Sequence, residues 1–237
     1  MKNSTKEIIN EINTYRDESK AAFLPRFFKT GKGEYGEGDQ FIGVVVPNLR
    51  IVAKKHFDAD FDTLRELLAS PYHEYRLTAL LALTYRYAKL KDHASRETCV
   101  NFYVSQVDAI NNWDLVDLSC YKILGHWLFD KDKQLLDDWG KENHLWKQRI
   151  AMISCMHFVK QGEFKDALAI ADLLQHHPHD LIHKAVGWIL REIGKEDEQL
   201  LIDYLTPRYK EMPRTMLRYA IERFEEGKRK AFLNSMI

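Results

Sequence analysis

A tryptophan and an aspartate in the segment NNWDLVD, residues 111–117, have the residue types and the spacing needed for catalysis. Asp117 follows Trp113 by four residues, so both side chains share one face if the segment is helical. A carboxylate there could stabilise developing positive charge beside an indole ring. The alternative for Asp117 is a structural ion pair with a neighbouring arginine. Asp114 faces elsewhere, and we expect it to serve as an acid in the first helical turn.

A second cluster lies in HKAVGWILRE, residues 183–192, where an aromatic side chain stands between two cations. Lys184, Trp188 and Arg191 fall on one face of a helix because of their spacing. Such a stripe suits a surface that meets phosphate groups and a π-system, whereas a tryptophan by itself usually belongs to the core. The cluster is therefore a candidate nucleic-acid contact, with burial of Trp188 as the alternative.

Other basic residues are candidates for phosphate contacts. Arg149 in LWKQRIA, residues 145–151, follows Trp146 by three positions. A guanidinium fork in a fixed place favours phosphate, and the alternative is a salt bridge between helices. Basic residues at comparable places in other repeats would give a positive track along a concave surface. The candidates for this track are Arg76, Arg218 and, beside a glycine-rich segment, Lys29.

Two other sequence patterns, a glycine motif and a histidine cluster, do not support a nucleotide site or a metal site. Glycines within residues 31–36 match GxGxxG, but no strand precedes them and acidic residues follow, so a dinucleotide site is rejected. We interpret the segment as a flexible surface loop that could also pass close to a phosphate backbone. The histidines of residues 176–179 flank a proline and lack partners with ligand spacing, so no metal is expected. No cofactor is expected, and no histidine is placed to activate Ser119 or Cys120.

Apolar residues recur with the spacing of amphipathic helices along almost the whole chain. Helix pairs repeat at intervals of roughly 33 to 40 residues, as in HEAT and armadillo arrays. The expected starts lie near Tyr72, Asn112, Leu145, Asp180 and Arg214. We predict an all-α fold, an α-α superhelix (solenoid) of degenerate HEAT-like repeats.

The expected organisation is a single domain over residues 1–237, with the glycine-rich loop near residues 30–46. One apolar stripe runs from Trp113 to Trp127, which predicts helix throughout that stretch. One break between helices is expected at residues 93–95.

Composition agrees with a globular helical protein. The chain has 237 residues, 45% hydrophobic and 30% charged, with 11 Gly and 6 Pro, which argues against all-β, collagen-like and disordered chains. Lys+Arg and Asp+Glu both number 35, so a general basic bias is excluded but a local basic face is not. The three cysteines lie in apolar runs, and no signal peptide or membrane span is recognisable. We therefore expect a cytoplasmic protein with reduced core thiols and no membrane partner.

The three segments above resemble those of the AlkD-like family of DNA alkylation repair proteins, which are HEAT-like-repeat DNA glycosylases. The family has a tryptophan followed four positions later by an aspartate, an arginine after a Trp-x-x step, and a late Lys-Ala-x-Gly-Trp-x-x-Arg helix. The matching residues in this chain are Trp113, Asp117, Arg149, Trp188 and Arg191. The resemblance in order and helix context covers residues 20–225 approximately.

The resemblance implies a monofunctional, hydrolytic glycosylase that removes cationic purines alkylated at N3 or N7 from double-stranded DNA and leaves an abasic site. Asp117 would be the catalytic carboxylate against the deoxyribose, and Trp113 and Trp188 would pack beside the lesion nucleotide. Phosphate contacts would come from Arg149, Lys184 and Arg191. The resemblance also implies a monomer.

Two other hypotheses stay open. The segment Gly31–Gly43 is longer and richer in glycine than the family leads us to expect, and Phe27 stands where a tyrosine can occur. The chain could therefore be a relative that binds distorted or branched DNA without excising bases. A net charge of zero leaves room for a protein-binding scaffold. Base release from alkylated DNA, and DNA binding at low salt, separate the three hypotheses.

Overall fold

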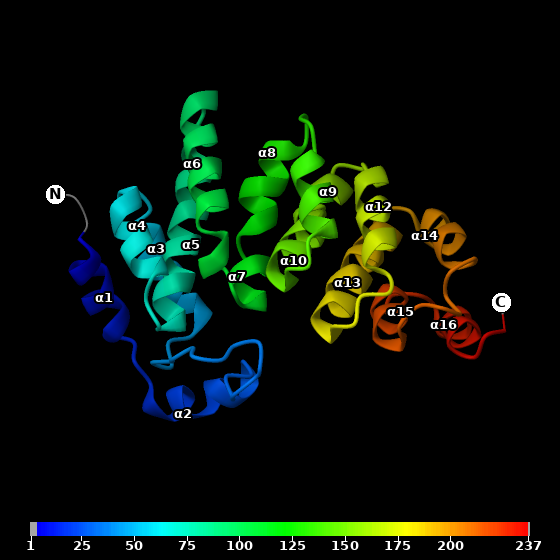
Figure 1. The fold of residues 1–237 in the computed structure, drawn as a ribbon, viewed down its shortest axis with the longest axis horizontal. Helices are drawn as coiled ribbons and strands as arrows, with labels where there is room; N and C mark the ends of the chain where they lie inside the picture. Colours follow the sequence, from blue (N-terminus) through cyan, green and yellow to red (C-terminus); the bar gives the residue numbers. More distant parts are fainter. Residues whose placement is uncertain (1–3, 237) are drawn as a thin grey trace. The chain divides into compact units, whose positions relative to one another are not determined.

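The computed structural model describes residues 4–236, which form helices joined by turns (Figure 1). Extended pairing within these residues is limited to an isolated bridge between Gln40 and Tyr72. The all-α prediction is therefore confirmed. The chain divides into two compact units, Met1–Ile123 and Leu124–Ile237. The expectation of a single domain stays a prediction.

The first unit is organised around α5 (His73–Lys89), a helix with buried residues on all sides. Helices α3 (Val46–Lys55) and α4 (Phe61–Leu68) pack against it. A helix that is apolar around most of its circumference must be covered in this way. The other elements of the unit are α1 (Thr5–Asn13), α2 (Glu18–Phe27), α6 (His93–Ser105), the 3-10 turn η1 (Val107–Ala109) and α7 (Trp113–Asp117).

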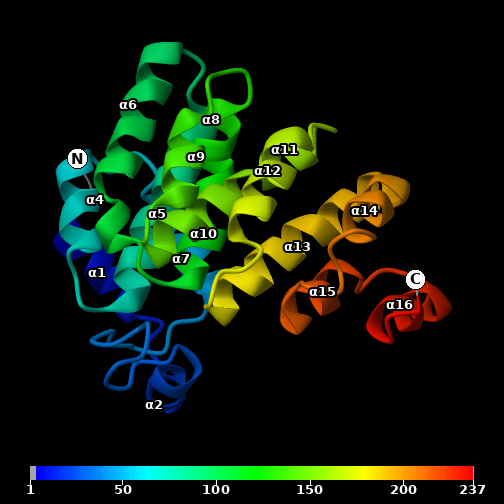
Figure 2. The same cartoon turned by 45° about the vertical axis from the view of Figure 1, so that its right-hand side comes forward.

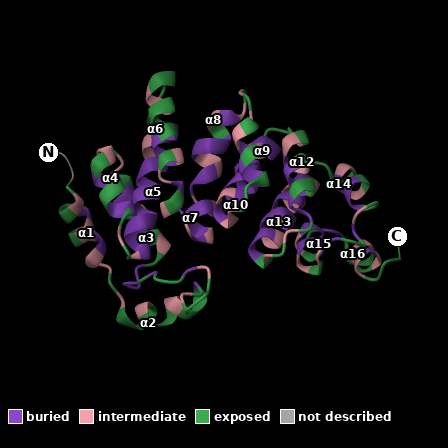
Figure 3. Ribbon diagram, viewed as in Figure 1, coloured by how far each residue is buried: buried purple, intermediate pink, exposed green. Residues whose placement is uncertain are grey.

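Helix α2 differs from the other long helices of this unit because none of its residues is buried (Figure 3). Asp17 caps its first turn by accepting the Lys20 backbone N–H at 3.1 Å, and Pro25 lies inside its last turn. Phe23 and Phe27 project from it with 60% and 52% of their surface exposed. The helix is therefore held at its ends and through ring contacts, not by a buried apolar face.

The second unit is organised around α13 (Asp180–Glu196), and Figures 1 and 2 both show α15 (Arg214–Ala220) beside it. The two helices touch at Gly187, where a β-carbon would lie 2.5 Å from the Met216 carbonyl oxygen. Helices α10 (Leu145–Ser154), α12 (Lys165–Leu174) and α14 (Glu198–Leu205) also pack against α13. The remaining helices of the unit are α8 (His126–Leu128), α9 (Gln134–Lys141), α11 (Met156–Val159) and α16 (Glu226–Leu233).

The expected helix starts are confirmed to within one residue in both units. They are the first residues of α5, α7, α10, α13 and α15. Polar side chains or proline mark several of these starts, since Asn112 caps α7, His144 caps α10 and Pro213 precedes α15. The residues that predict helix starts in the sequence therefore cap or precede the helices in the structure.

Two details of the helix prediction are wrong. The break expected at residues 93–95 is the first turn of α6, because Asp92 caps this helix by accepting the Ser95 backbone N–H. The stretch from Trp113 to Trp127 is not one regular helix, because α7 ends at Asp117 and a π-helical turn, η2 (Tyr121–Gly125), follows. Apolar spacing does not reveal such an interruption, because the residues keep nearly the same period on either side of it.

The three cysteines are free and buried, as expected for core thiols. Between residues 4 and 236, no helix is both long enough and apolar enough to cross a bilayer.

Candidate functional site

Helix α7 carries both Trp113 and Asp117. Its cap, Asn112, is buried and accepts the Trp113 backbone N–H at 2.9 Å. Trp113 and Asp117 are half-buried, whereas the three residues between them are buried. The predicted helical spacing of the two candidates is therefore confirmed, and Asp114 lies in the first turn as expected.

The turn that follows Asp117 is fixed by buried hydrogen bonds. The Ser119 hydroxyl donates to the Leu115 carbonyl and lies 3.1 Å from the Tyr103 hydroxyl. Burial chiefly raises the pKa of the Tyr103 phenol, and the negative charge of Asp117 contributes to the same shift. The turn that follows Asp117 is thus held from the buried side of the chain.

Trp113 belongs to a cluster of rings contributed by α2, the segment after it, and α5. Its indole stacks on Phe28, with centroids 5.3 Å apart and planes at 9°, and meets Phe27 edge-on at 5.9 Å. Phe28 also contacts Phe41 at 5.0 Å and His73 at 4.7 Å. Because stacked and edge-on rings constrain one another, the indole is oriented by its neighbours within the unit.

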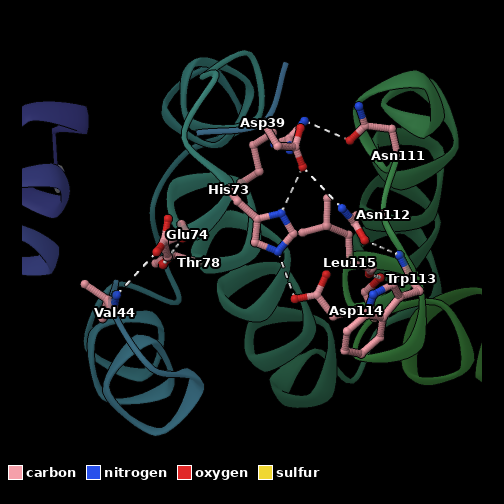
Figure 4. A network of polar contacts seen from close by, with 12 residues as sticks. Asp39, Val44, His73, Glu74, Thr78, Asn111, Asn112, Trp113, Asp114 and Leu115 are labelled. Carbon is pink, nitrogen blue, oxygen red and sulfur yellow. Dashed lines mark hydrogen bonds and ion pairs between the residues drawn. The ribbon is translucent and has the colours of Figure 1, made fainter. Parts of the chain in front are cut away.

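A buried ionic network next to this cluster is drawn in Figure 4. His73, which is 2% exposed, donates from Nε2 to Asp114 at 2.8 Å and from Nδ1 to Asp39 at 3.2 Å. Burial disfavours the charged imidazole, but the two carboxylates outweigh burial and raise the pKa of His73 to about 9. Burial also opposes ionisation of Asp39, yet His73 and Arg76 hold its pKa below the usual value. The charged forms of His73 and Asp39 are therefore favoured at neutral pH.

Arg76 completes this network, and its placement does not support the predicted phosphate contact. Its Nη2 atom lies 2.6 Å from Asp39 Oδ1, and its Nη1 atom donates to Asn111 at 2.8 Å. Only 6% of the residue is exposed. A buried guanidinium with these partners is not available to DNA, and it serves instead to join α5 to the glycine-rich segment and to the residues before α7.

The glycine-rich segment 30–46 is bound to α5 through its later residues, whereas most of residues 31–38 are exposed, as expected for a surface loop. Its flexibility stays a prediction. The buried carboxylate of Glu74 accepts the backbone N–H groups of residues 42–44, the shortest at 2.8 Å from Gly43. Gly43 has φ +83°, and a β-carbon there would lie 1.9 Å from the Asp17 carbonyl oxygen. The segment is therefore tied to α5 and also to the start of α2.

Helix α13 of the second unit presents the second candidate cluster. Lys184, Trp188 and Arg191 are all half-buried, so Trp188 is not a core residue. The Trp188 indole Nε1 donates to Glu192 at 3.2 Å. The predicted common face is confirmed, with the indole edge fixed by a carboxylate of the same helix.

Carboxylates balance both cations of this cluster. Lys184 pairs with Asp180 at 2.6 Å. Arg191 pairs with Glu192 and, across to the segment after α15, with Glu222. A phosphate group would have to compete with these carboxylates for Lys184 and Arg191. The spacing of basic and aromatic residues in the sequence does not reveal this competition.

The remaining basic candidates differ in exposure. Arg149 is 4% exposed and donates from Nη1 to the Leu181 carbonyl at the start of α13. Arg218 on α15 and Lys29 after α2 are exposed, and neither forms an ion pair with another residue of the described chain 4–236. Lys29 has φ +56°, a left-handed conformation that turns the chain after α2. Arg218 and Lys29 therefore have charges available to an external anion.

Two histidines of residues 176–179 accept backbone hydrogen bonds just before and at the start of α13. The His177 ring accepts the His179 backbone N–H at 3.0 Å, and the His179 ring accepts the Leu181 N–H at 3.1 Å. Burial lowers the pKa of both rings, which favours the neutral form that can accept. Among the described residues, no group of three or more His, Cys, Asp or Glu side chains is arranged so that it could hold a metal ion.

The sequence from residue 8 to residue 224 matches the family model described as DNA alkylation repair enzyme. The chain belongs to this DNA alkylation repair family. The match includes α7 and α13 and thus both candidate clusters of the repair protein. No curated protein matches the chain significantly in sequence.

Two solved structures share the fold of this family member. A predicted DNA alkylation repair enzyme from Enterococcus faecalis is 14% identical, with a TM-score of 0.68 over 89% of this chain and 97% of that one. AlkD2 from Streptococcus mutans is 16% identical, with a TM-score of 0.54 over 88% and 99%. At such identities the likeness concerns the fold, and it confirms the prediction of a helical-repeat protein.

Sequence reasoning missed the residues that organise the site of this repair protein, namely Asp39 and His73. They lie 34 positions apart, so no local spacing connects them. A signal was nevertheless present, because His73, Glu74 and Arg76 open a helix that is otherwise rich in leucine and alanine. Polar residues in such a helix need buried partners, and these come from the glycine-rich segment and from α7.

Proposed function

We propose that this repair protein is a monofunctional glycosylase. It hydrolyses the N-glycosidic bond of cationic N3- or N7-alkylated purines in double-stranded DNA and leaves an abasic site. The observation that carries the proposal is helix α7, where Trp113 and Asp117 are half-buried and one turn apart. The Phe28 ring stacks on Trp113, and the Tyr103–Ser119 hydrogen bond holds the turn after Asp117. A carboxylate on the same helix face as an aromatic ring suits a transition state with positive charge.

The proposed reaction needs little catalytic assistance from the protein, because the substrate base is already cationic and is a good leaving group. When the bond between C1′ and the purine breaks, its electron pair goes to the base and neutralises it. The sugar gains oxocarbenium character, which a carboxylate stabilises more in the transition state than in the ground state. Water then adds at C1′ and loses a proton. In this scheme Asp117 faces the sugar and helps to position the water.

The other candidates are proposed to bind the DNA. Trp113 would pack beside the lesion nucleotide, with its second face already stacked on Phe28. Trp188 would supply a further ring. Arg149 is more buried than Arg76 and donates to the Leu181 carbonyl, so we assign it to the packing of α10 against α13 and not to a phosphate contact. Phosphate contacts would come from Lys184, Arg191, Arg218 and Lys29. The chain would act as a monomer on double-stranded DNA.

The decisive variant is Asp117→Asn, which keeps the shape of the side chain and removes its charge. We expect base release from methylated duplex DNA to fall by about a hundredfold or more, because the charge stabilises the transition state electrostatically. DNA affinity, measured by fluorescence anisotropy, should stay within about twofold because binding rests on the phosphate contacts. The release of 3-methyladenine and 7-methylguanine is measured by chromatography.

The matched control is Asp62→Asn, an exposed aspartate on α4 in the same unit. It makes the same change of charge and should leave release unaltered. Undiminished release by Asp117→Asn would remove the carboxylate from the mechanism. If the wild type releases no base but still binds DNA, the glycosylase proposal is wrong and the second candidate function, described next, is favoured.

The second candidate function is binding of distorted or branched DNA without excision. The glycine-rich segment favours it, because Asp39 and Glu74 tie its later residues to α5 while Lys32 on the segment and Lys29 just before it are exposed. This function predicts tighter binding to a four-way junction than to a plain duplex, with affinity that falls as salt rises. Equal affinity for both DNAs would count against it.

A further inference from the structure

We propose that Phe23 and Phe27 on α2 form a stacking platform for a nucleobase that has left the DNA base stack, an inference that rests on the proposed DNA-binding function. The two rings are stacked, with centroids 6.4 Å apart and planes at 25°, and both are more than half exposed. They stand on a helix that has no buried residue. Large rings in this setting contribute little to a core, and they offer a flat apolar face to a ligand.

The platform is the exposed end of a continuous row of rings. Phe27 contacts Phe28 edge-on at 5.1 Å and Trp113 at 5.9 Å. Phe28 lies 4.7 Å from the His73 ring, which is fixed between two carboxylates. Because the row is anchored in the buried network, Phe27 is oriented before any ligand arrives, and little freedom is lost on binding.

The charges around the platform point to a nucleic acid strand. Arg26, Lys29 and Lys32 are exposed, and none of them forms an ion pair within residues 4–236. The nearby acids Glu34 and Glu37 are also exposed, but their carboxylates are engaged, since each accepts a backbone N–H group of the same segment, at 2.8 Å and 2.7 Å. Aromatic faces flanked by available cations suit bases joined by phosphates. A second copy of this chain would bring the same cations and so meet like charge.

The platform has a different task from that of α7. Asp117 is proposed to act on the sugar of the lesion, whereas Phe23 would stack on a base that the distorted duplex no longer stacks. Apolar rings that occupy a disrupted base step stabilise bent or opened DNA. The platform would therefore raise affinity for helices that contain an unpaired base, and it would have little effect on an intact duplex.

The test compares two duplexes, one fully paired and one with a single unpaired 2-aminopurine. The wild type should quench the fluorescence of the unpaired base when it binds. Phe23→Ala should bind the bulged duplex about tenfold more weakly, because it loses one base–aromatic contact. Its affinity for the paired duplex should be unchanged. Phe23→Trp should retain both properties. Ile51→Ala is the matched control, because Ile51 on α3 is 54% exposed and lies outside the row of rings.

Several outcomes would overturn the platform. One is equal affinity of wild type and Phe23→Ala for the bulged duplex, and another is quenching that persists in Phe23→Ala. A third is loss of self-association on Phe23→Ala in sedimentation, which would assign the rings to an interface between copies. Base release from methylated DNA is measured separately, so a wild type that stacks the base but releases none refutes only the glycosylase. Absence of all DNA binding would refute both.

Discussion

At the scale of single residues, the partner of a basic side chain decides which anions it can bind. Arg191 is the clearest case, because Glu192 and Glu222 both contact its guanidinium group. Glu222 is exposed and comes from outside α13, so it can be removed without disturbing that helix. A phosphate that binds Arg191 must displace this carboxylate, and Glu222 therefore limits the affinity for DNA.

We predict that Glu222→Gln increases DNA affinity by a few-fold. The released guanidinium gains a phosphate contact, so the slope of log K against log salt should become more negative by about one. Anisotropy titrations of a plain duplex at several salt concentrations measure both quantities. Glu211→Gln is the control, since Glu211 is exposed and no ion pair joins it to Arg191. Equal gains from the two variants would mean that only net charge matters.

At the scale of elements, the glycine-rich segment and α2 depend on each other. Gly43 lies where the segment passes the start of α2, with the Asp17 carbonyl and the Ala21 amide directly against it. Gly38 has a similar backbone conformation, with φ +90°, but no atom lies within 4 Å of a β-carbon placed there. Substitutions at Gly43 and Gly38 therefore distinguish the destabilisation caused by atomic crowding from that caused by backbone conformation alone.

We predict that Gly43→Ala lowers the free energy of unfolding by about 3 kcal/mol or more, because conformational strain and an unavoidable backbone clash combine. Gly38→Ala should cost about 1 kcal/mol, from conformation alone. Urea denaturation followed by circular dichroism measures both. Similar losses for the two variants would show that the segment can move away from α2 without penalty.

How much of these elements the sequence predicts depends on the range of the interactions. Helix starts at α7 and α13 follow from capping residues and apolar spacing, which are local. The candidate pair Trp113 and Asp117 also follows from local spacing. The fold of segment 30–46 does not, because Asp39 and Glu74 act across more than thirty residues. The same holds for Arg76, whose charge suggests a phosphate contact until its buried carboxylate partner is known.

At the scale of the whole molecule, the two units differ in how they are stabilised. The network of Asp39, His73, Asp114 and Arg76 lies entirely within the first unit. The fold raises the pKa of His73 from 6.5 to about 9, so the protonated form is favoured in the folded state. The stabilisation is complete below the unfolded pKa and is lost as pH rises through the folded pKa.

We predict that raising the pH from 7 to 10 destabilises the first unit more than the second. Hydrogen exchange by mass spectrometry, corrected for the intrinsic rate at each pH, should show faster exchange in α5 and α7, with α13 much less affected. In His73→Gln the difference between the units should shrink, because the titrating group is gone. Equal acceleration in both units of the wild type would refute this assignment.

The burial of all three free thiols has a practical consequence for these experiments. Burial raises the pKa of Cys99, which lowers the thiolate fraction that reacts with maleimides. A cysteine introduced at an exposed position such as Lys32 would therefore react first, without prior removal of the native ones. The chain is in this sense ready for site-specific fluorophores or spin labels, with which the distance between its two units can be followed in solution.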